Sequence, residues 1–467
     1  MFSFDICHIF KKCLISYKYC DNIHLNEKIS QLSVYFFIMR KDKNMLLKFS
    51  FKNFKSFRNE VTLDLTATKI TEHSDRNFEV GNVKVLPVAC IIGANASGKS
   101  NVMEAFSFMC GYIIDSLNFA GGQVNPDVQN KFLKPVLFLF DSKSRNDGTK
   151  FEIYFSMNDD ESEKIYQYGF VFKENIIEEE WLNYKSKTSR EDFKTIFYRG
   201  KDENDFSGLE KDKIKNIEVS IQKETLILTL GAKLNESLLL RIYKWVFKNA
   251  SLDFGNVAAE ILINQTMGVI KNTFNDAVRK DIVEYLSSFD NAIKNIDMKE
   301  VEINQITKQK LLEITFSHKL NDKDEYVELP YQIESSGTQK MLALYPFLKK
   351  IFENGGVIFI DELNSKLHPL LLRTIIQMFL NKNINKNKAQ LVFTSHDVWQ
   401  LKSDILRRDE IWFTEKNDEG VSNLYSLSDF VGEDGEKIRK DEDFQKNYLM
   451  GKYGAIPNLK GFDRVFK

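Results

Sequence analysis

The sequence predicts an α/β protein organised around a parallel β-sheet. In the last third of the chain, apolar runs of strand length alternate with a segment of helical periodicity, which is the order found in parallel sheets. Residues 85–92 form an apolar run typical of a strand buried on both faces. A glycine-containing loop and a helical pattern over residues 100–113 follow this strand directly.

The first half of the chain contains mostly strands. Residues 45–65 alternate apolar and polar side chains and predict two β-strands. In the helical segment 100–113, Val102, Phe106 and Met109 share one face. Further strands are expected at residues 136–140, 151–155, 166–172 and 194–199.

The second half alternates between helices and strands. Helices are expected within residues 236–296, and a strand at 310–318 follows them. The sequence shows no internal repeat, and no heptad pattern is long enough for an extended coiled coil. The C-terminal third then predicts a strand at 356–360, a helix at 369–380, a strand at 390–395 and a strand pair around 410–415 and 423–427.

Composition narrows the class of protein. The 467 residues, 43% of them hydrophobic, suffice for two or three structural units. A net charge of -1 excludes a strongly basic surface over the whole chain and leaves room for a local basic groove. The five Cys lack metal-ligand spacing, and no apolar stretch reaches the roughly 18–20 residues that span a bilayer. We therefore expect a cytoplasmic protein without membrane contact.

Residues 1–44 differ from the remainder of the sequence. They hold three of the five Cys, and no helical or strand period continues from them into the strand that begins at Met45. We interpret them as an upstream extension that is not part of the native protein. The alternative is an N-terminal helix packed on the core.

The loop after the buried strand has the spacing of a phosphate-binding loop. Residues 93–100 read Gly-Ala-Asn-Ala-Ser-Gly-Lys-Ser and match GxxxxGK[ST]. Backbone N–H groups in such a loop, with a helix N-terminus behind them, form a concave anion site. Lys99 is expected to reach the β- and γ-phosphates of ATP, and the Ser100 hydroxyl to ligate Mg²⁺. The full set of expected ATP contacts is Gly93, Asn95, Ala96, Ser97, Gly98, Lys99, Ser100 and Asn101.

Two acidic residues end the strand at 356–360. A carboxylate in this position can hold the Mg²⁺ shell, which is the role expected of Asp361. Glu362 is expected to be the general base that polarises the attacking water. Two acids at a strand end are most often simply solvated, but their combination with a phosphate loop favours the catalytic interpretation.

Two further segments carry candidate residues. Residues 334–339, Glu-Ser-Ser-Gly-Thr-Gln, open a helical pattern, so their N–H groups and hydroxyls are placed to meet an anion. The alternative is an ordinary helix cap by Ser336. Thr-Ser-His-Asp at 394–397 ends the strand after the acidic one, and His396 is expected to contact the γ-phosphate or the attacking water. His368 is expected to be structural or to orient a loop between subunits.

These four motifs, in this order, resemble the ABC-type ATPases, and specifically their SMC/RecF/OLD branch. Residues 335–339 resemble the ABC signature, with Thr338 in place of its second Gly. Residues 358–369 resemble the Walker B and D-loop segment of the branch, with Asn364 where Asp is common. Residues 394–397 resemble the switch-histidine segment.

The ends of the ATPase region extend the resemblance. Residues 51–57 resemble the strand that begins these proteins. Residues 448–459 resemble the tail of the bacterial OLD-like AAA-family ATP-binding proteins linked to abortive infection and phage defence. The resemblance covers most of residues 45–459. It implies a P-loop NTPase head of the ABC type, with a mixed β-sheet and a compact, mainly helical insertion.

The resemblance also implies how the chain is divided and how the site is assembled. Two subunits are expected to hold ATP between them head to tail, as a homodimer or a higher even oligomer. Gln167 is a candidate for the Q-loop glutamine. The expected signature contacts from the second subunit are Ser335, Ser336, Gly337 and Gln339. The expected parts are the extension 1–44, the N-lobe with the P-loop 45–113, the lobe strands and insertion 114–330, and the C-lobe 331–467.

Three functions remain open from the sequence. The first is an ATP-hydrolysing sensor in anti-phage defence that acts through a separate effector protein, because the short segment after residue 400 lacks the acidic cluster of a toprim-like nuclease. The second is a DNA-binding repair ATPase of the RecF/SMC type, which ATP-dependent and salt-sensitive DNA binding would favour. The third is an ATP-gated scaffold with little turnover.

The interpretation of residues 1–44 leads to a direct test. A protein that begins at Met45 should be soluble and should hydrolyse ATP as fast as the full chain, because the removed segment has no pattern that joins the core. Phosphate release by both proteins under the same conditions measures this. Aggregation of the shortened protein, or slower hydrolysis, would show instead that the extension packs on the core.

Overall fold

Strand β5 (Val88–Gly93) lies inside a six-stranded sheet. The computed structural model describes residues 44–119, 134–159, 162–186, 192–255, 274–304, 309–320, 323–432, 435 and 437–457. The order of the sheet is β11-β15-β16-β5-β17-β18, with every neighbouring pair parallel except β17 and β18. The other strands are β11 (Ala250–Asp253), β15 (Val357–Asp361), β16 (Gln390–Thr394), β17 (Ile411–Lys416) and β18 (Ser422–Ser426).

The central strand is buried on both faces, as its apolar sequence predicts. Val88, Cys90 and Ile92 belong to one hydrophobic cluster, and Ala89 and Ile91 belong to the other. Successive side chains of a strand point to opposite faces, so an apolar run without polar breaks needs cover on both sides. The sheet is therefore the middle layer of the body.

Helix α3 (Lys99–Asp115) and a second sheet cover the first face. The Phe106 ring of α3 stacks on the Phe359 ring of β15, with centroids 3.8 Å apart and planes 10° apart. The second sheet is antiparallel throughout and has the order β10-β9-β8-β7-β6-β1-β2. Its strands are β1 (Met45–Lys52), β2 (Val61–Asp64), β6 (Thr149–Asp159), β7 (Ser162–Lys173), β8 (Ile176–Ser186), β9 (Lys194–Arg199) and β10 (Asn204–Asp205).

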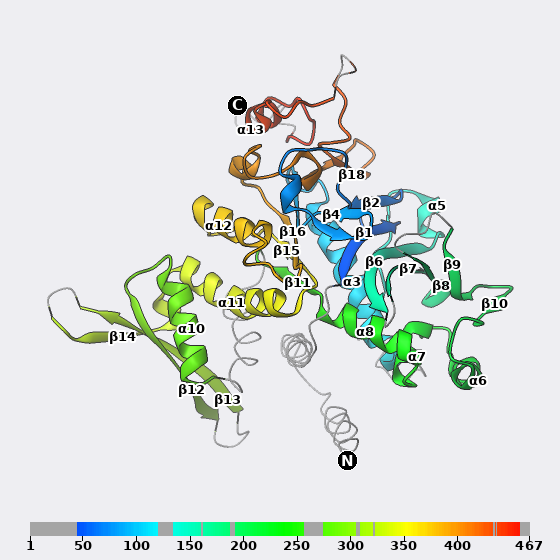
Figure 1. The fold of residues 1–467 in the computed structure, drawn as a ribbon, viewed down its shortest axis with the longest axis horizontal. Helices are drawn as coiled ribbons and strands as arrows, with labels where there is room; N and C mark the ends of the chain where they lie inside the picture. Colours follow the sequence, from blue (N-terminus) through cyan, green and yellow to red (C-terminus); the bar gives the residue numbers. More distant parts are fainter. Residues whose placement is uncertain are drawn as a thin grey trace.

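Helices α11 (Ser336–Asn354) and α12 (Pro369–Leu380) cover the other face, together with the C-terminal helix α13 (Phe444–Leu449). A lobe made of α10 (Asp276–Ser287) and a three-stranded sheet projects from the body beside α11 (Figure 1). The sheet of this lobe contains β12 (Ile293–Asn304), β13 (Gln309–Lys319) and β14 (Tyr326–Pro330). The smaller elements are β3 (Phe78–Val80), β4 (Val83–Val85), α5 (Ser142–Arg145), α6 (Lys211–Ser220), α7 (Ile227–Lys233) and α8 (Ser237–Lys248).

The predicted α/β class with a mixed sheet is confirmed, and most predicted elements lie within a few residues of the observed ones. The segment 114–330 differs most. Beside its helices it contains β11 and the sheet β12–β14, so the insertion is less helical than expected. The reason is visible in β12, where Ile296 and Met298 alternate with polar Asp297, a period-two pattern that favours a strand.

One predicted strand, at residues 136–140, is wrong. This segment follows the loop after β1 instead of joining a sheet: the Val136 carbonyl accepts from Lys55 N–H, and Phe138 N–H donates to the Asn53 side chain. Only Phe138 is fully buried, while Leu139 and Phe140 are exposed. An apolar run alone does not show whether a partner strand exists.

Two further sequence expectations concern the N-terminal segment and membrane-spanning helices. Residues 1–43 fall outside the described residues, so the interpretation of the N-terminal extension stays a prediction. No helix in the described ranges is both long and apolar enough to cross a bilayer.

The ring stack between α3 and β15 leads to a stability prediction. Phe106→Ala should lower the free energy of unfolding by about 3–5 kcal/mol, because it leaves a cavity between helix and sheet. Phe140 is 72% exposed, so Phe140→Ala is the matched control and should change stability little. Chemical denaturation of both variants measures the difference. Equal midpoints would contradict the assigned role of the stack.

Candidate nucleotide site

The loop 93–98 turns between β5 and α3 within tight packing. A Cβ on Gly93 would lie 2.4 Å from the Thr414 carbonyl oxygen, and one on Gly98 would lie 2.8 Å from Ser422 Oγ. Gly98 has φ 116° and Ala96 has φ 62°, both in the left-handed region. Successive backbone conformations of this kind turn N–H groups toward one side, which is how such loops form anion sites. Glycine at 93 and 98 is thus required by sterics.

Lys99 is buried against the same loop. Its Nζ donates to the carbonyl oxygens of Gly93 and Ala94, at 2.9 Å each. Burial lowers the pKa of Lys99, and the nearby carboxylates of Asp361 and Glu362 act in the opposite direction. The ammonium is therefore held inside the loop, beside the acidic strand end.

Hydroxyl groups of the C-terminal strands brace the loop. Ser97 Oγ lies 2.6 Å from Thr414 Oγ1 on β17. Ser422 on β18 donates to the Ser97 carbonyl at 2.7 Å, and its Oγ also lies 2.7 Å from Ser56 Oγ. The Asn101 amide, a predicted ATP contact, donates to Ser56 Oγ at 2.7 Å. In this arrangement Asn101 supports the loop, and its contact with ATP stays a prediction.

The C-terminal segment also contacts the loop. Ala94 N–H donates to the Ala455 carbonyl oxygen at 2.9 Å. The Tyr448 hydroxyl donates to the same carbonyl at 3.0 Å, and the Tyr425 hydroxyl donates to the Tyr453 carbonyl at 2.8 Å. The C-terminal tail therefore packs directly against the phosphate-binding loop.

The two predicted acids lie at the carboxyl end of β15. Thr394 at the end of β16 holds both: its hydroxyl donates to Asp361 Oδ1 and accepts from Glu362 N–H at 2.7 Å. Glu362 has φ 50°, a left-handed conformation that is costly for a residue with a side chain. It persists only where surrounding contacts hold it. The Thr394 hydroxyl helps to hold this backbone conformation and ties it to the Asp361 carboxylate.

His396 lies beside Glu362. Its Nε2 is 3.8 Å from Glu362 Oε1, and its backbone N–H donates to Asn364 Oδ1 at 3.2 Å. Burial lowers the pKa of His396, the Lys99 charge lowers it further, and the carboxylates of Glu362 and Asp361 oppose both. Gly255, which follows β11, packs closely against the Glu362 carboxylate. A Cβ on Gly255 would lie 2.6 Å from the Glu362 carboxyl carbon.

The structure thus gathers Lys99, Asp361, Glu362 and His396 at the carboxyl ends of β5, β15 and β16. Asn95 and Ala96, at the tip of the loop, are exposed. The predicted roles of these residues stay predictions.

The predicted signature residues lie elsewhere on the chain. Ser335 and Ser336 are exposed at the N-terminus of α11, and Gly337 lies against the Lys366 carbonyl. The cap differs from the expected one: Ser335, not Ser336, accepts from Thr338 N–H, at 3.1 Å. Because the Thr338 side chain bonds back to Ser335, the turn is complete one residue earlier.

Gln339 and two other candidates have local partners. The Gln339 amide donates to the carbonyls of Tyr331 and Glu334, so it holds the turn before α11. His368 caps α12 by accepting a hydrogen bond from Leu370 N–H. This is a structural role, one of the two that the sequence predicted for His368. Gln167 bonds within the antiparallel sheet, and its assignment to the Q-loop stays a prediction.

Lys340 is a residue that the sequence reasoning missed. It is buried on α11, and its Nζ donates to the carbonyls of Phe254 at 2.7 Å and Ser365 at 2.8 Å. Burial, and to a lesser degree the charge of Lys366, lowers the pKa of Lys340 to about 8. Lys340 therefore joins the signature helix to the segment after the acidic strand. The structural roles of Thr394, Ser422 and Gly255 were also missed, because each residue acts through a partner far away in sequence.

The side chains present fit Mg²⁺. Ser100 lies in the first turn of α3, directly after the loop, and Asp361 presents a carboxylate at the end of β15. Hydroxyl and carboxylate oxygens are the ligands that Mg²⁺ prefers, together with phosphate oxygens of a nucleotide. In the described ranges no three His, Cys, Asp or Glu side chains gather into a metal cluster.

A strand, a glycine loop with Lys99 and a helix, next to an acidic strand of the same parallel sheet, define a P-loop nucleotide-binding protein. Residues 88–398 match the family described as "AAA domain, putative AbiEii toxin, Type IV TA system". The match covers more than half of the chain, and the protein belongs to this family. The predicted resemblance to AAA-family ATP-binding proteins is thus confirmed, and the finer placement in the SMC/RecF/OLD branch stays a prediction.

Two solved structures show similarity over most of the chain. The SMC head bound to the C-winged helix domain of ScpA is 14% identical, covers 82% of this chain and 97% of its own, and has a TM-score of 0.36. The SMC head domain from Thermotoga maritima is 14% identical, covers 82% of this chain and 98% of its own, and has a TM-score of 0.35. No curated protein sequence matches the chain.

The Thr394 hydroxyl gives a sharp prediction. Thr394→Val keeps the shape but leaves Glu362 N–H and Asp361 without their shared partner, which should destabilise the fold by about 1–3 kcal/mol. ATP hydrolysis should fall more than ATP affinity, because the carboxylates move while the loop stays. Thr394→Ser keeps the hydroxyl and is the matched control. Equal loss in the Val and Ser variants would contradict the special role of the hydroxyl, because Thr394→Ser keeps it.

Proposed function

We propose that the protein binds and hydrolyses ATP in a site that two subunits complete. The meeting of Lys99, Glu362 and His396 at one sheet edge is the observation that carries this proposal. The attraction between the Lys99 charge and the carboxylates of Asp361 and Glu362 supports the proposal. So does the distance of 3.8 Å between His396 and Glu362. Membership of an AAA-domain family supports nucleotide binding.

Each residue then has a chemical role. The loop N–H groups and Lys99 hold the β- and γ-phosphates, and Ser100 and Asp361 would hold Mg²⁺, which neutralises phosphate charge. Glu362 accepts a proton from water as the water oxygen bonds to the γ-phosphorus. The bond from that phosphorus to the ADP oxygen breaks. His396, whose lowered pKa favours the neutral ring, donates one N–H to the γ-phosphate.

The position of α11 supports a shared site. Ser335 and Ser336 are exposed, and in the described part of the chain no hydrogen bond joins them to the phosphate-binding loop. The N-terminus of this 19-residue helix presents free N–H groups and the positive end of its dipole. These groups fit the γ-phosphate of ATP bound to a second subunit. A head-to-tail homodimer brings the two surfaces together.

We further propose that the ATP cycle controls a separate effector protein in anti-phage defence. The description of the family as a putative toxin of a type IV toxin–antitoxin system supports a function of this kind. The contact between Ala455 and the loop at Ala94 supports a route by which the nucleotide state reaches the surface of the C-lobe.

The test of the shared site begins with Glu362→Gln. This variant should bind ATP and form a stable dimer, while hydrolysis falls by about 10²–10⁴-fold, because Gln cannot accept the proton. Light scattering with and without ATP measures the dimer, and phosphate release measures turnover. Glu353→Gln, on the exposed side of α11, is the matched control and should keep full turnover.

Mixing two inactive variants completes the test. Lys99→Ala removes the phosphate contact, and Ser336→Arg places a bulky cation where the second subunit docks. A mixture of the two can form one intact site, so part of the activity should return. Ser142→Arg, on an exposed surface of α5, controls for the added charge and should stay active. A folded mixture without activity, or a monomeric Glu362→Gln protein in ATP, would rule out the shared site.

A further inference from the structure

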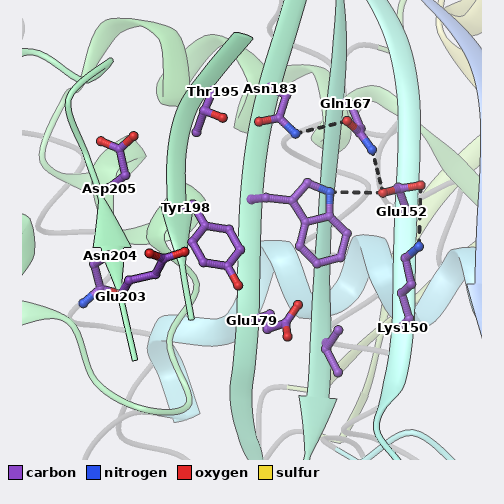
Figure 2. Close-up of a pocket in the computed structure, with 12 residues that line it drawn as sticks. Lys150, Glu152, Gln167, Glu179, Asn183, Thr195, Tyr198, Glu203, Asn204 and Asp205 are labelled. Atoms are coloured by element: carbon purple, nitrogen blue, oxygen red, sulfur yellow. Dashed lines mark hydrogen bonds and ion pairs between the residues drawn. The ribbon is translucent and has the colours of Figure 1, made fainter. Parts of the chain in front are cut away.

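The antiparallel sheet carries a pocket of about 650 Å³ over strands β6 to β10 (Figure 2). Its lining side chains come from these strands and from the turn between β9 and β10. None of them belongs to the phosphate-binding loop, the acidic strand end or the signature helix. The pocket is therefore separate from the proposed ATP site.

An aromatic ring lies across the pocket floor. Trp181 on β8 is the register partner of Gly169 on β7, and a Cβ on Gly169 would lie 2.4 Å from Trp181 Cζ2. Glycine at this position lets the indole lie over the backbone of β7, because any side chain would occupy the same space. Trp181 Nε1 reaches beyond β7 and donates to Glu152 Oε1 on β6, at 3.1 Å. The ring is thus fixed flat on the sheet.

A polar network around Glu152 holds this arrangement. The Gln167 amide donates to Glu152 Oε1 at 2.9 Å, and the Asn183 amide donates to Gln167 Oε1 at 3.0 Å (Figure 2). Lys150 Nζ lies 3.8 Å from Glu152 Oε2 and 3.0 Å from Glu60 Oε1. It also lies 5.7 Å from the centre of the Trp181 ring. The charges of Lys150 and Glu152 are therefore compensated within the protein.

The opposite side of the pocket is acidic. Glu179, Glu203 and Asp205 surround Tyr198 there (Figure 2). Burial raises the pKa of Tyr198, and the charges of Glu179 and Glu203 raise it further. Among the described residues that line the pocket, Lys150 is the only basic one. Besides the ion pair of Lys150 and Glu152, the pocket lining therefore carries three carboxylates next to the rings of Trp181 and Tyr198.

We propose that this pocket binds an arginine side chain of a partner protein. A planar guanidinium can stack on the fixed indole while its N–H groups reach the carboxylates at the rim. A phosphate-bearing ligand, such as a nucleic acid backbone, would be repelled by these carboxylates. A purely apolar ligand would bury them without partners. A lysine ammonium has the right charge but lacks the flat surface that the ring would cover.

The test uses the full-length protein and two blocked peptides, acetyl-Gly-Arg-Gly-amide and the same peptide with citrulline, which is neutral and has the same shape. Calorimetric titration at low ionic strength should give at least about tenfold tighter binding of the arginine peptide, from the cation's contacts with ring and carboxylates. The peptide with lysine should bind between the two. Added salt should weaken the arginine complex.

Variants locate the binding. Glu179→Gln with Glu203→Gln should weaken arginine binding about fivefold, in the range of exposed charge pairs. Glu284→Gln, on the exposed side of α10, is the matched control and should change nothing. An unchanged affinity for ATP shows that the double variant is folded. Equal binding of the arginine and citrulline peptides, no measurable arginine binding, or binding unaffected by the double variant would each overturn the proposal.

Discussion

The stack of Phe106 on Phe359 joins the two halves of the nucleotide site. Phe106 belongs to the helix behind the phosphate-binding loop, and Phe359 lies in the strand that ends at Asp361. Both rings are buried, so neither the helix nor the strand can shift without opening a cavity. The contact thus ties together the two elements whose ends carry Lys99 and Asp361.

Short polar side chains hold the phosphate-binding loop and the acidic strand end in place through hydrogen bonds. Thr394 holds the backbone of Glu362 in a left-handed conformation, while Ser422 and Thr414 hold the phosphate-binding loop. Each lies in a strand or strand end next to the element that it braces. A hydroxyl both donates and accepts, so one small side chain can satisfy two backbone or carboxylate groups in a buried place. The C-terminal tail adds the Ala455 carbonyl to the same loop.

The antiparallel sheet connects the pocket at Trp181 with the nucleotide site through strand β1. The pocket lies over β6 to β10, and β1 pairs with β6 in the same sheet. The turn after β1 contains Ser56, which contacts both Asn101 of the helix and Ser422 of β18. A partner bound at the pocket would therefore touch a sheet whose other end supports the phosphate-binding loop.

The sequence by itself determined the α/β class, the phosphate-binding loop, the acidic strand end and the position of His396 after the next strand. These features depend on local spacing and on apolar periodicity, which are read without knowing any partner. Only the tertiary structure decided the roles of Thr394, Lys340 and Gly255, because each acts through a residue distant in sequence. It also decided that residues 136–140 are not a strand and that Ser335 caps the signature helix. Strand pairing and close approach depend on which segments meet, and a single apolar or serine-containing stretch does not contain that information.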